Sequence, residues 1–307
     1  MKKQLPNFLV IGAGKSGTTS LYEYLNSHLE VFMSPIKETN FFALENEKLV
    51  PPSEDKDQMF HYPWSVTDFE AYKALFKDVK NEKAIGEVSP MYLYNENAAH
   101  NIKSKIPNVK LIAMLRQPVD RLYSRFMHLA RENRTPTAHF IDALDQESIW
   151  WKRNDLVQEG FYAAHLQKYF QLFPSEQIKV ILYDDFRKDP IAVMQEVYAF
   201  VGVDPLAEYE CTEEFNVSGL IKSKNIDLLI GQNSLLKRAI SSYTPGLSKI
   251  LASNQVVKSV VNRLRNKNLE KPRLSNELKK RINDEIYTSD ILKLEKLIGR
   301  DLSHWIY

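Results

Sequence analysis

Glycines, one lysine and several hydroxyl side chains gather within a few residues near the start of the chain. The segment 7–20 reads NFLVIGAGKSGTTS, an apolar run that leads into this polar cluster. Glycines let a backbone bend closely around an anion, and a helix start adds unpaired N–H groups and a positive dipole end. The pattern predicts a strand, a phosphate-binding turn and a helix. The candidate phosphate ligands are Gly14, Lys15, Ser16, Gly17, Thr18 and Thr19.

The same segment departs from the phosphate loop of nucleoside triphosphatases. That loop has the pattern G-x-x-x-x-G-K-[ST], in which the lysine follows the second glycine. Gly12 and Gly17 have this spacing, but Thr18 stands in the lysine position and Lys15 lies inside the turn. We therefore expect a phosphate to be bound here in another way than in an ATPase or a kinase.

A second candidate anion site follows the apolar run Val109–Leu115. In a triphosphatase the corresponding strand leads to an aspartate that holds Mg²⁺, whereas this run is followed by Arg116. A guanidinium binds phosphate and repels a metal ion, although a surface ion pair is the alternative for Arg116. Pro118 favours a helix start, and Ser124 would reach the same anion only if the intervening loop folds back.

Composition restricts the classes of protein that remain. The chain has 307 residues, enough for one large α/β domain or two small ones, and its net charge of +2 gives no reason to expect a nucleic-acid partner. Its one cysteine, Cys211, cannot form an internal disulfide. No apolar run approaches the roughly 18 residues of a membrane span, and the first strand leaves no room for a signal peptide. We expect a cytoplasmic protein, or one trimmed of an anchor.

Buried strands alternate with helices along much of the chain, which predicts an α/β fold with a parallel β-sheet of the P-loop type flanked by helices. Right-handed crossovers would then bring the strand ends, and with them the candidate ligands, to one edge of the sheet. The expected strands are Phe8–Ile11, Val109–Leu115 and Ile178–Tyr183, and the expected helices are Ser20–Ser27, Val119–Arg131, Tyr162–Leu172 and Leu274–Trp305, the last ended by Gly299.

Two stretches differ from this alternation. Residues 45–70 are polar and contain prolines and aromatic residues, which indicates an excursion from the sheet or a substrate lid. Residues 221–281 carry fourteen Lys or Arg against three Asp or Glu, with apolar residues at helical spacing. Three interpretations stay open for this basic stretch: a solvated helical face, peripheral contact with an anionic membrane, or a groove for an anionic glycan.

Two phosphate sites at one sheet edge, with no aspartate for magnesium, resemble the sulfotransferases that use 3′-phosphoadenosine 5′-phosphosulfate (PAPS). The resemblance covers most of the chain outside residues 45–80 and 230–268, and it is closest to the bacterial and heparan-type carbohydrate branch. It implies a single sulfotransferase domain over residues 1–307, with a basic helical insertion at about 225–268. The matching motifs are GKSGTT from Gly14, LRQP from Leu115 with YS at Tyr123, KETNFF from Lys37, GEVSP from Gly86, EGFY from Glu159, SGLIKSK from Ser218, and the ending from Asp290 to Trp305.

The resemblance also implies roles for residues in the donor site. Lys15 would stabilise the bridging oxygen between sulfur and phosphate, and the turn with its hydroxyls would hold the 5′-phosphate. Arg116 and Ser124 would hold the 3′-phosphate. Tyr162 would lie near the nucleotide, and the basic loop that contains Lys222, Ser223 and Lys224 would close over it. PAPS would be the co-substrate, and no metal is implied.

The general base is less obvious. Sulfotransferases of small phenols and steroids use a histidine at the turn that corresponds to Glu87–Ser89, but no histidine stands there. Glu38 is then the candidate base, as in the glycan branch, and its alternative is a surface or helix-capping carboxylate. A free glutamate has a pKa of about 4.3, so it would act concertedly with bond formation. Some members of the branch have a lysine at the position of Val88, where it helps to bind donor or acceptor. In this chain either Lys37 or another cation takes over that role, or the acceptor is not a highly anionic polymer.

These motifs predict transfer of a sulfuryl group to a hydroxyl or amine of a glycan or glycolipid. A kinase-like phosphotransferase and a non-catalytic module that binds nucleotide or membrane are the alternatives. The residues that contact the acceptor are not identified by any motif, because acceptor pockets are formed by variable loops.

Overall fold

The computed structural model describes residues 5–51, 61–132, 134–206, 220–221, 269–270 and 273–306. The chain divides into two compact units, the second formed by Phe126–Thr135 and Val217–Leu274 and the first by the rest of the chain. The second unit contains a two-stranded antiparallel pair, β6 (Leu220–Ile221) with β7 (Leu269–Glu270). The predicted insertion at about 225–268 lies outside the described residues, as do Lys222, Ser223 and Lys224.

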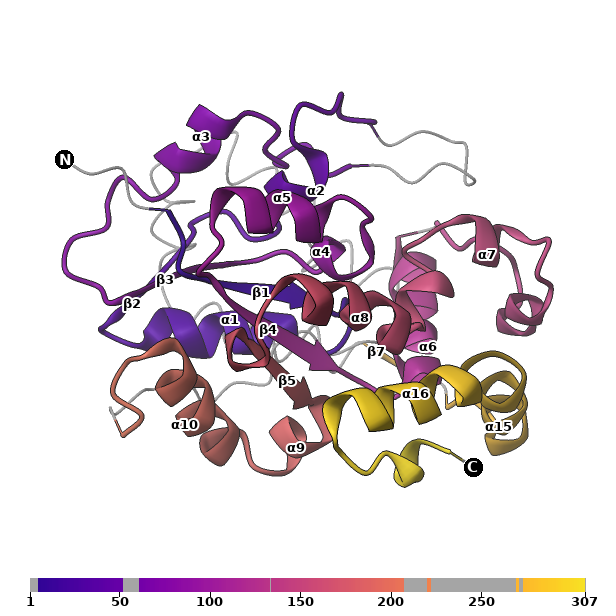
Figure 1. Ribbon diagram of the computed structural model, residues 1–307. Coiled ribbons are helices and arrows are strands. Elements are labelled where there is room, and N and C mark those ends of the chain that lie inside the picture. The colour runs from indigo at the N-terminus through magenta and orange to yellow at the C-terminus, as the bar shows by residue number, and fades with distance from the viewer. Residues whose placement is uncertain are drawn as a thin grey trace. The chain divides into compact units, whose positions relative to one another are not determined.

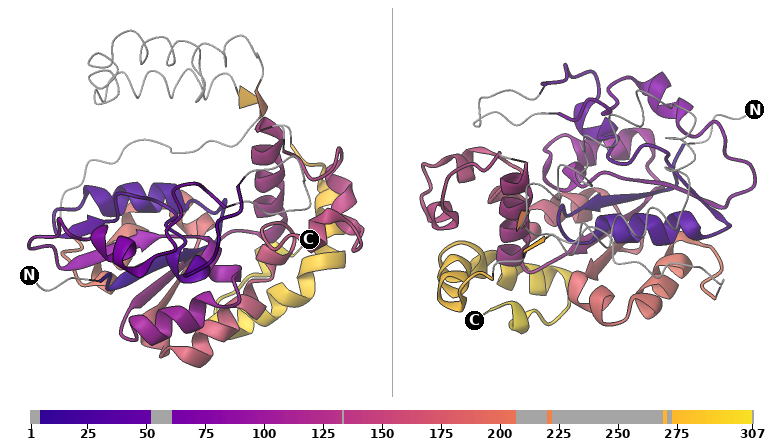
Figure 2. Two further views of the ribbon diagram at one scale, coloured as in Figure 1. Left: turned by 90° about the horizontal axis from the view of Figure 1, so that it is seen from above. Right: turned by 180° about the vertical axis from the view of Figure 1, so that it is seen from behind.

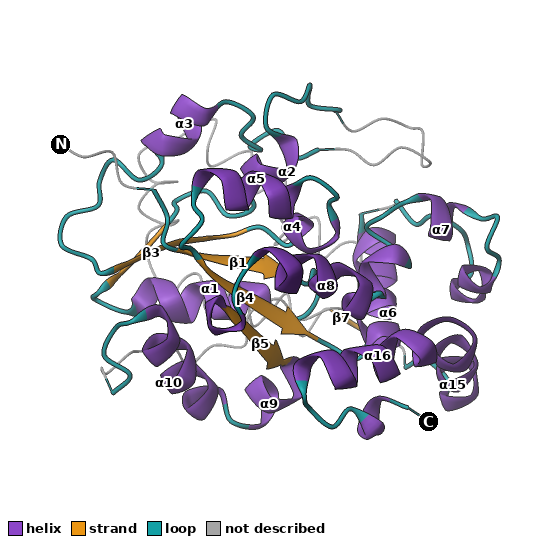
Figure 3. Cartoon of the chain, viewed as in Figure 1, coloured by secondary structure: helices purple, strands orange, loops and turns teal. Residues whose placement is uncertain are grey.

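The first unit is built on one five-stranded parallel sheet (Figures 1 and 3). The strand order is β2-β3-β1-β4-β5, so β1 is central and pairs with β3 on one side and β4 on the other. This confirms the predicted α/β fold with a parallel sheet. The strands are β1 (Phe8–Gly12), β2 (Val31–Met33), β3 (Ala84–Val88), β4 (Lys110–Leu115) and β5 (Ile178–Leu182).

Helices cover both faces of this sheet. On one face α1 (Thr18–Ser27) and α10 (Pro190–Val201) lie side by side, and on the other lie α4 (Met91–Tyr94), α5 (Ala98–Lys105) and α8 (Tyr162–Leu172) (Figures 1 and 2). In α10, apolar residues recur at helical spacing and pack with Leu21 and Leu25 of α1 on the strands. A continuous apolar core on both sides of the strands holds their ends in fixed positions.

The sequence locates the apolar strands but misses two others. The predicted Phe8–Ile11, Val109–Leu115 and Ile178–Tyr183 each agree with a strand to within one residue at either end, whereas β2 and β3 were not expected. In β3, Gly86 and Glu87 obscure the apolar pattern. A Cβ at Gly86 would lie 2.2 Å from the Phe8 ring, so glycine is needed for the pairing of β3 with β1.

The shorter helices connect these layers. They are α2 (Phe41–Leu44), α3 (Phe69–Ala74), α7 (Ile149–Lys152) and α9 (Tyr183–Lys188), and the longer α6 (Pro118–Arg131) follows β4. Of the predicted excursion at 45–70, residues 52–60 lie outside the described residues. Within the part of the chain that is described, no helix is both long and apolar enough to cross a bilayer.

The prediction of one continuous helix over Leu274–Trp305 is wrong in detail. The structure has α15 (Asn276–Ile282), a π-helical turn (Asn283–Tyr287) and α16 (Thr288–Ile298), followed by Gly299 in the left-handed region. The π turn inserts a wider loop into the helical hydrogen-bond pattern, which the apolar spacing does not reveal. The apolar spacing of this segment predicts five inward residues. Of these, Ile282, Ile286, Ile291 and Leu294 are buried, and Leu297 is only half-buried.

This C-terminal region supplies the N-terminal cap of α8. The Asp290 carboxylate accepts hydrogen bonds from the backbone N–H of Ala163 at 2.9 Å and of Ala164 at 3.3 Å. These N–H groups belong to the first turn of α8, where no carbonyl of the same helix can accept them. Asp290 therefore ties α16 to the helix that begins with Tyr162.

We expect Asp290→Ala to lower the free energy of unfolding by about 1–2 kcal/mol, the usual cost of losing a helix cap. Denaturant titration of the wild type and the variant measures this difference. Asp78→Ala removes an exposed carboxylate and serves as the matched control, with no more than a few tenths of a kcal/mol expected. A loss at Asp290 no larger than that of the control would contradict the capping role.

Candidate functional site

The turn after β1 leads directly into α1. Gly17 is the N-cap of α1 with φ 94°, and no side chain caps the helix. The α1 helix begins at Thr18, two residues before the predicted start, so both threonines lie in its first turn. Because first-turn N–H groups have no partner within a helix, they and the dipole end form an anion-binding site. The Ser16 N–H is already used, since it donates to the Ala13 carbonyl at 3.3 Å.

Lys15 is held in an uncommon backbone conformation. Its φ of 64° lies in the left-handed region, which residues with a Cβ rarely adopt. The preceding Gly14 N–H donates to Glu159 Oε1 at 2.6 Å, and the Lys15 carbonyl accepts from Arg116 Nη1 at 3.3 Å. Contacts on both sides therefore fix the Lys15 backbone, as is common where strain is retained at a functional site.

The Ser16 hydroxyl tests whether this turn suits an anionic ligand. Its oxygen is buried and makes no hydrogen bond of regular geometry, although it lies close enough to Tyr162 to lower that phenol's pKa. Burial itself raises the pKa of Tyr162, so this side chain remains a neutral donor. A buried hydroxyl without a regular partner beside an uncapped helix start fits a phosphate group well.

Arg116 follows β4 and meets the same turn. Its guanidinium lies over the Tyr183 ring at 5.0 Å, and its carbonyl accepts from the Tyr162 hydroxyl at 2.9 Å. The structure thus brings Lys15, Arg116 and Tyr162 together, as the sequence predicted for one nucleotide site. Ser124 is buried in α6, and its role toward a 3′-phosphate stays a prediction.

Glu38 lies at the edge of the neighbouring strand. Its N–H donates to the Val88 carbonyl at the end of β3, and its own φ is 62°. The Glu38 carboxylate pairs with Lys37 Nζ at 2.8 Å, and both side chains are about one-quarter exposed (26%). This makes Lys37 an ion-pair partner of the candidate base, and it leaves the carboxylate accessible from solvent.

Glu87 is a buried carboxylate whose hydrogen bonds fix the chain just after Glu38. Its carboxylate is fully buried and accepts hydrogen bonds from four hydroxyls. Burial raises the pKa of Glu87, and these hydrogen bonds oppose the rise. Since Thr39 directly follows Glu38, the network fixes the backbone on one side of the candidate base. The four donors are Tyr72 (3.0 Å), Tyr92 (2.6 Å), Thr39 (2.7 Å) and Ser89 (2.8 Å).

Sequence reasoning missed the ion pair beneath the turn. Arg121 is fully buried and donates to Glu159 Oε2 at 2.8 Å, while the other oxygen of Glu159 accepts from Gly14. Both residues lie within motifs of the sequence, but neither motif identified their contact. The charge of Glu159 beside Gly160 was a signal in the sequence, but it does not identify Arg121 as its partner.

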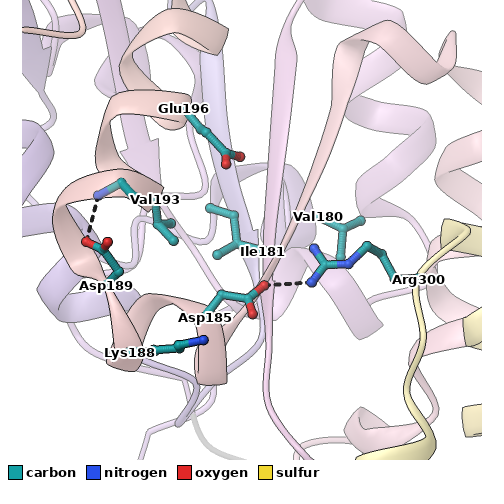
Figure 4. Close-up of a pocket in the computed structure, with 9 residues that line it drawn as sticks. Val180, Ile181, Asp185, Lys188, Asp189, Val193, Glu196 and Arg300 are labelled. Atoms are coloured by element: carbon teal, nitrogen blue, oxygen red, sulfur yellow. Dashed lines mark hydrogen bonds and ion pairs between the residues drawn. The ribbon is translucent and has the colours of Figure 1, made fainter.

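Other groups of charged residues do not join this site. A pocket of about 380 Å³ lies among β5, α9 and α10, with an ion pair between Asp185 and Arg300 at its rim (Figure 4). None of its lining residues is a predicted ligand. Among the residues that the structure describes, no group of three or more His, Cys, Asp or Glu side chains could hold a metal ion.

Only the C-terminal part of the basic stretch 221–281 is described in side-chain detail. There Lys279 pairs with Asp120 at 2.8 Å, and Lys280 and Arg281 pair with carboxylates one turn further along the chain. Lys279 thus links α15 to α6, whereas Lys280 and Arg281 form ion pairs with residues of the π-helical turn that follows α15. Most other basic residues of the stretch 221–281 lie outside the described residues, so the three interpretations of this stretch stay predictions.

Comparisons with known proteins agree with this geometry. A model of the "Sulfotransferase family" matches residues 6–208. Heparan sulfate N-deacetylase/N-sulfotransferase 4 of Mus musculus, a bifunctional protein, is 31% identical over 222 residues, which are 67% of this chain and 23% of that protein. Carbohydrate sulfotransferase 15 of Homo sapiens is 26% identical over 251 residues, 66% of this chain and 45% of that protein. The chain thus spans about a quarter to a half of the length of these two relatives.

A solved structure extends the similarity over the whole chain. The sulfotransferase from Alicyclobacillus acidocaldarius has a TM-score of 0.69 and 28% identity, covering 98% of this chain and 99% of that one. The family model covers both the turn after β1 and the strand that leads to Arg116. From the sheet, the turn and these similarities together, we conclude that this chain belongs to the sulfotransferase family.

Proposed function

We propose that the protein transfers a sulfuryl group from PAPS to a hydroxyl or amine of a glycan or glycolipid. The observation that carries the proposal is the hydrogen bond between Arg116 and the Lys15 carbonyl. It joins the ends of two adjacent strands, so that the Arg116 guanidinium meets the backbone of Lys15 beside an uncapped helix start. An anionic donor with two separate phosphate groups suits such a site.

The chain's own residues would bind this donor in two parts. The first-turn N–H groups of α1, together with the Ser16, Thr18 and Thr19 side chains, would hold the 5′-phosphate. Arg116 would pair with the 3′-phosphate, for which a guanidinium is suited by its charge and fixed donor geometry. Ser124, Lys222, Ser223 and Lys224 remain predicted contributors to the same nucleotide.

Lys15 would act on the leaving group. During in-line transfer, the bond from sulfur to the bridging oxygen breaks, and negative charge develops on the 5′-phosphate. A cation already fixed beside that oxygen stabilises the transition state without having to reorganise. The two contacts that hold the Lys15 backbone supply this preorganisation.

Glu38 would remove the proton of the acceptor as the new bond to sulfur forms. It is accessible from solvent, and its backbone is fixed by Val88 and by the Glu87 network through Thr39. Lys37 keeps the carboxylate close to a positive charge until the acceptor arrives. A positioned general base of this kind contributes about 10²–10⁴-fold to the rate.

The proposal of a glycan acceptor is supported by the names of the relatives. They include heparan sulfate N-sulfotransferases and a carbohydrate sulfotransferase. Val88 is buried in β3 and offers no charge to an anionic polymer, whereas the Lys37 side chain, paired with Glu38, is about one-quarter exposed (26%). Peripheral membrane contact through residues 221–281 and a cytoplasmic location stay predictions.

We expect Glu38→Gln to lower sulfuryl transfer about 100-fold or more, because the base is lost while the shape is kept. Binding of 3′-phosphoadenosine 5′-phosphate (PAP), the desulfonated product, should stay unchanged in calorimetry. Radiolabelled PAPS with a panel of unsulfated glycans measures the transfer. Glu45→Gln, which also loses a carboxylate paired with a lysine, is the matched control. Wild-type turnover in Glu38→Gln would exclude this residue as the base.

For Arg116→Ala we expect PAP to bind about 10–100-fold more weakly, in line with the loss of a charged hydrogen bond. The specific signature is discrimination: the variant should bind PAP and adenosine 5′-phosphate with equal affinity, whereas the wild type prefers PAP. Arg187→Ala removes an exposed arginine of α9 and should leave the preference intact. If Arg116→Ala retained the wild-type preference, its assignment to the 3′-phosphate would be wrong.

A further inference from the structure

A buried carboxylate lies directly behind the phosphate-binding turn, where an anion has to be accommodated. Glu159 Oε1 accepts from the Gly14 N–H at 2.6 Å, and its side chain is only 4% exposed. A Cβ at position 14 would lie 2.9 Å from this oxygen, so the approach depends on glycine. Such a charge would repel a bound phosphate unless it is neutralised.

The neutralising group is Arg121, which has no exposed surface. It donates to Glu159 Oε2 at 2.8 Å and to the Leu156 carbonyl. The arginine comes from α6 and the carboxylate from the 3₁₀ turn Gln158–Gly160 just before α8, so the pair links two elements beneath the turn. Replacing one partner of the pair by a neutral residue would leave the other as an uncompensated buried charge.

The two oxygens of Glu159 thus do different things. One orients the turn, because it accepts the hydrogen bond of the Gly14 N–H at 2.6 Å. The other is paired with Arg121, which cancels the charge that this orientation brings with it. The next residue is Lys15, whose left-handed backbone is held on its other side by Arg116.

We propose that Glu159 and Arg121 act together as positioning residues for Lys15: the carboxylate fixes the turn, and the arginine keeps that carboxylate from repelling the donor. This inference rests on the proposed binding of PAPS. It assigns to the pair a role in donor affinity beyond its contribution to folding. Neither residue contacts the donor.

The surroundings of Glu159 predict a dependence on pH. Burial raises the pKa of Glu159, and the charge of Arg121 is the largest influence that lowers it again. The other charged and titratable groups that face Glu159 are Arg125, Asp155, Tyr94, Tyr162 and Tyr287. Without Arg121, the carboxyl would be neutral at low pH and charged only at higher pH.

The test is PAP binding measured by calorimetry at pH 6 and pH 8.5 in the full chain. We expect Arg121→Met to weaken binding about 10-fold or more at pH 8.5, from repulsion across the turn. At pH 6 the loss should be smaller than at pH 8.5, because protonation of Glu159, which its burial favours, removes the repulsion. The double variant Arg121→Met/Glu159→Gln should bind within about 3-fold of the wild type at both pH values, since Gln keeps an acceptor without a charge.

Arg153→Met is the matched control, because Arg153 is also a buried arginine, with its ion pair to Asp155. The affinity of Arg153→Met for PAP, relative to that of the wild type, should be the same at pH 6 and at pH 8.5. The proposal is overturned if Arg121→Met binds like the wild type at pH 8.5, or if the double variant binds no better than Arg121→Met. Failure of the wild type itself to bind PAP would overturn the proposed function as well, so the two failures are distinguishable.

A measurement on the wild type keeps the proposal testable if Arg121→Met does not fold. Native-state hydrogen exchange should show the Gly14 amide protected in the absence of PAP, since its hydrogen bond goes to Glu159. The amides of Thr18 and Thr19 should gain protection only when PAP is added. Protection of Gly14 that appears only with PAP would contradict the proposed orientation of the turn.

Discussion

The peptide groups of the turn after β1 all need hydrogen-bond partners, and this need organises the site. β1 is completely buried between β3 and β4, and the turn that follows it is only partly exposed, so its peptide groups depend largely on protein partners. Glu159 takes the Gly14 N–H, Ala13 takes the Ser16 N–H, and Arg116 donates to the Lys15 carbonyl. The groups left over at the start of α1 are those that an anion can satisfy.

Two buried carboxylates therefore have parallel tasks at this edge of the sheet. Glu159 fixes the turn that carries Lys15, and Glu87 fixes the residues that follow Glu38. The charge of Glu159 is neutralised by an ion pair with an arginine, whereas Glu87 accepts hydrogen bonds from four hydroxyl groups. Lys15 and Glu38, the two proposed catalytic residues, both have left-handed backbones, which hydrogen bonds from neighbouring segments hold in place.

Much of this architecture could be predicted from local patterns. The apolar runs of β1, β4 and β5 identify a parallel sheet, and the residues just beyond them identify Lys15 and Arg116. The short β2 and the polar β3 could not be found in this way, because their residues are specified by pairing with distant strands rather than by their own periodicity. The partnership of Arg121 and Glu159 spans 38 positions and depends on how α6 and the turn before α8 pack.

The cap of α8 by Asp290 has a consequence for biosynthesis. The carboxylate lies 127 positions after the Ala163 amide that it binds, and far beyond the last strand of the sheet. A nascent chain on the ribosome can pair all five strands before this residue has been translated. During that interval α8, whose first residue binds the Arg116 carbonyl, lacks the cap that Asp290 provides. This edge of the sheet is thus completed only after α16 has been translated.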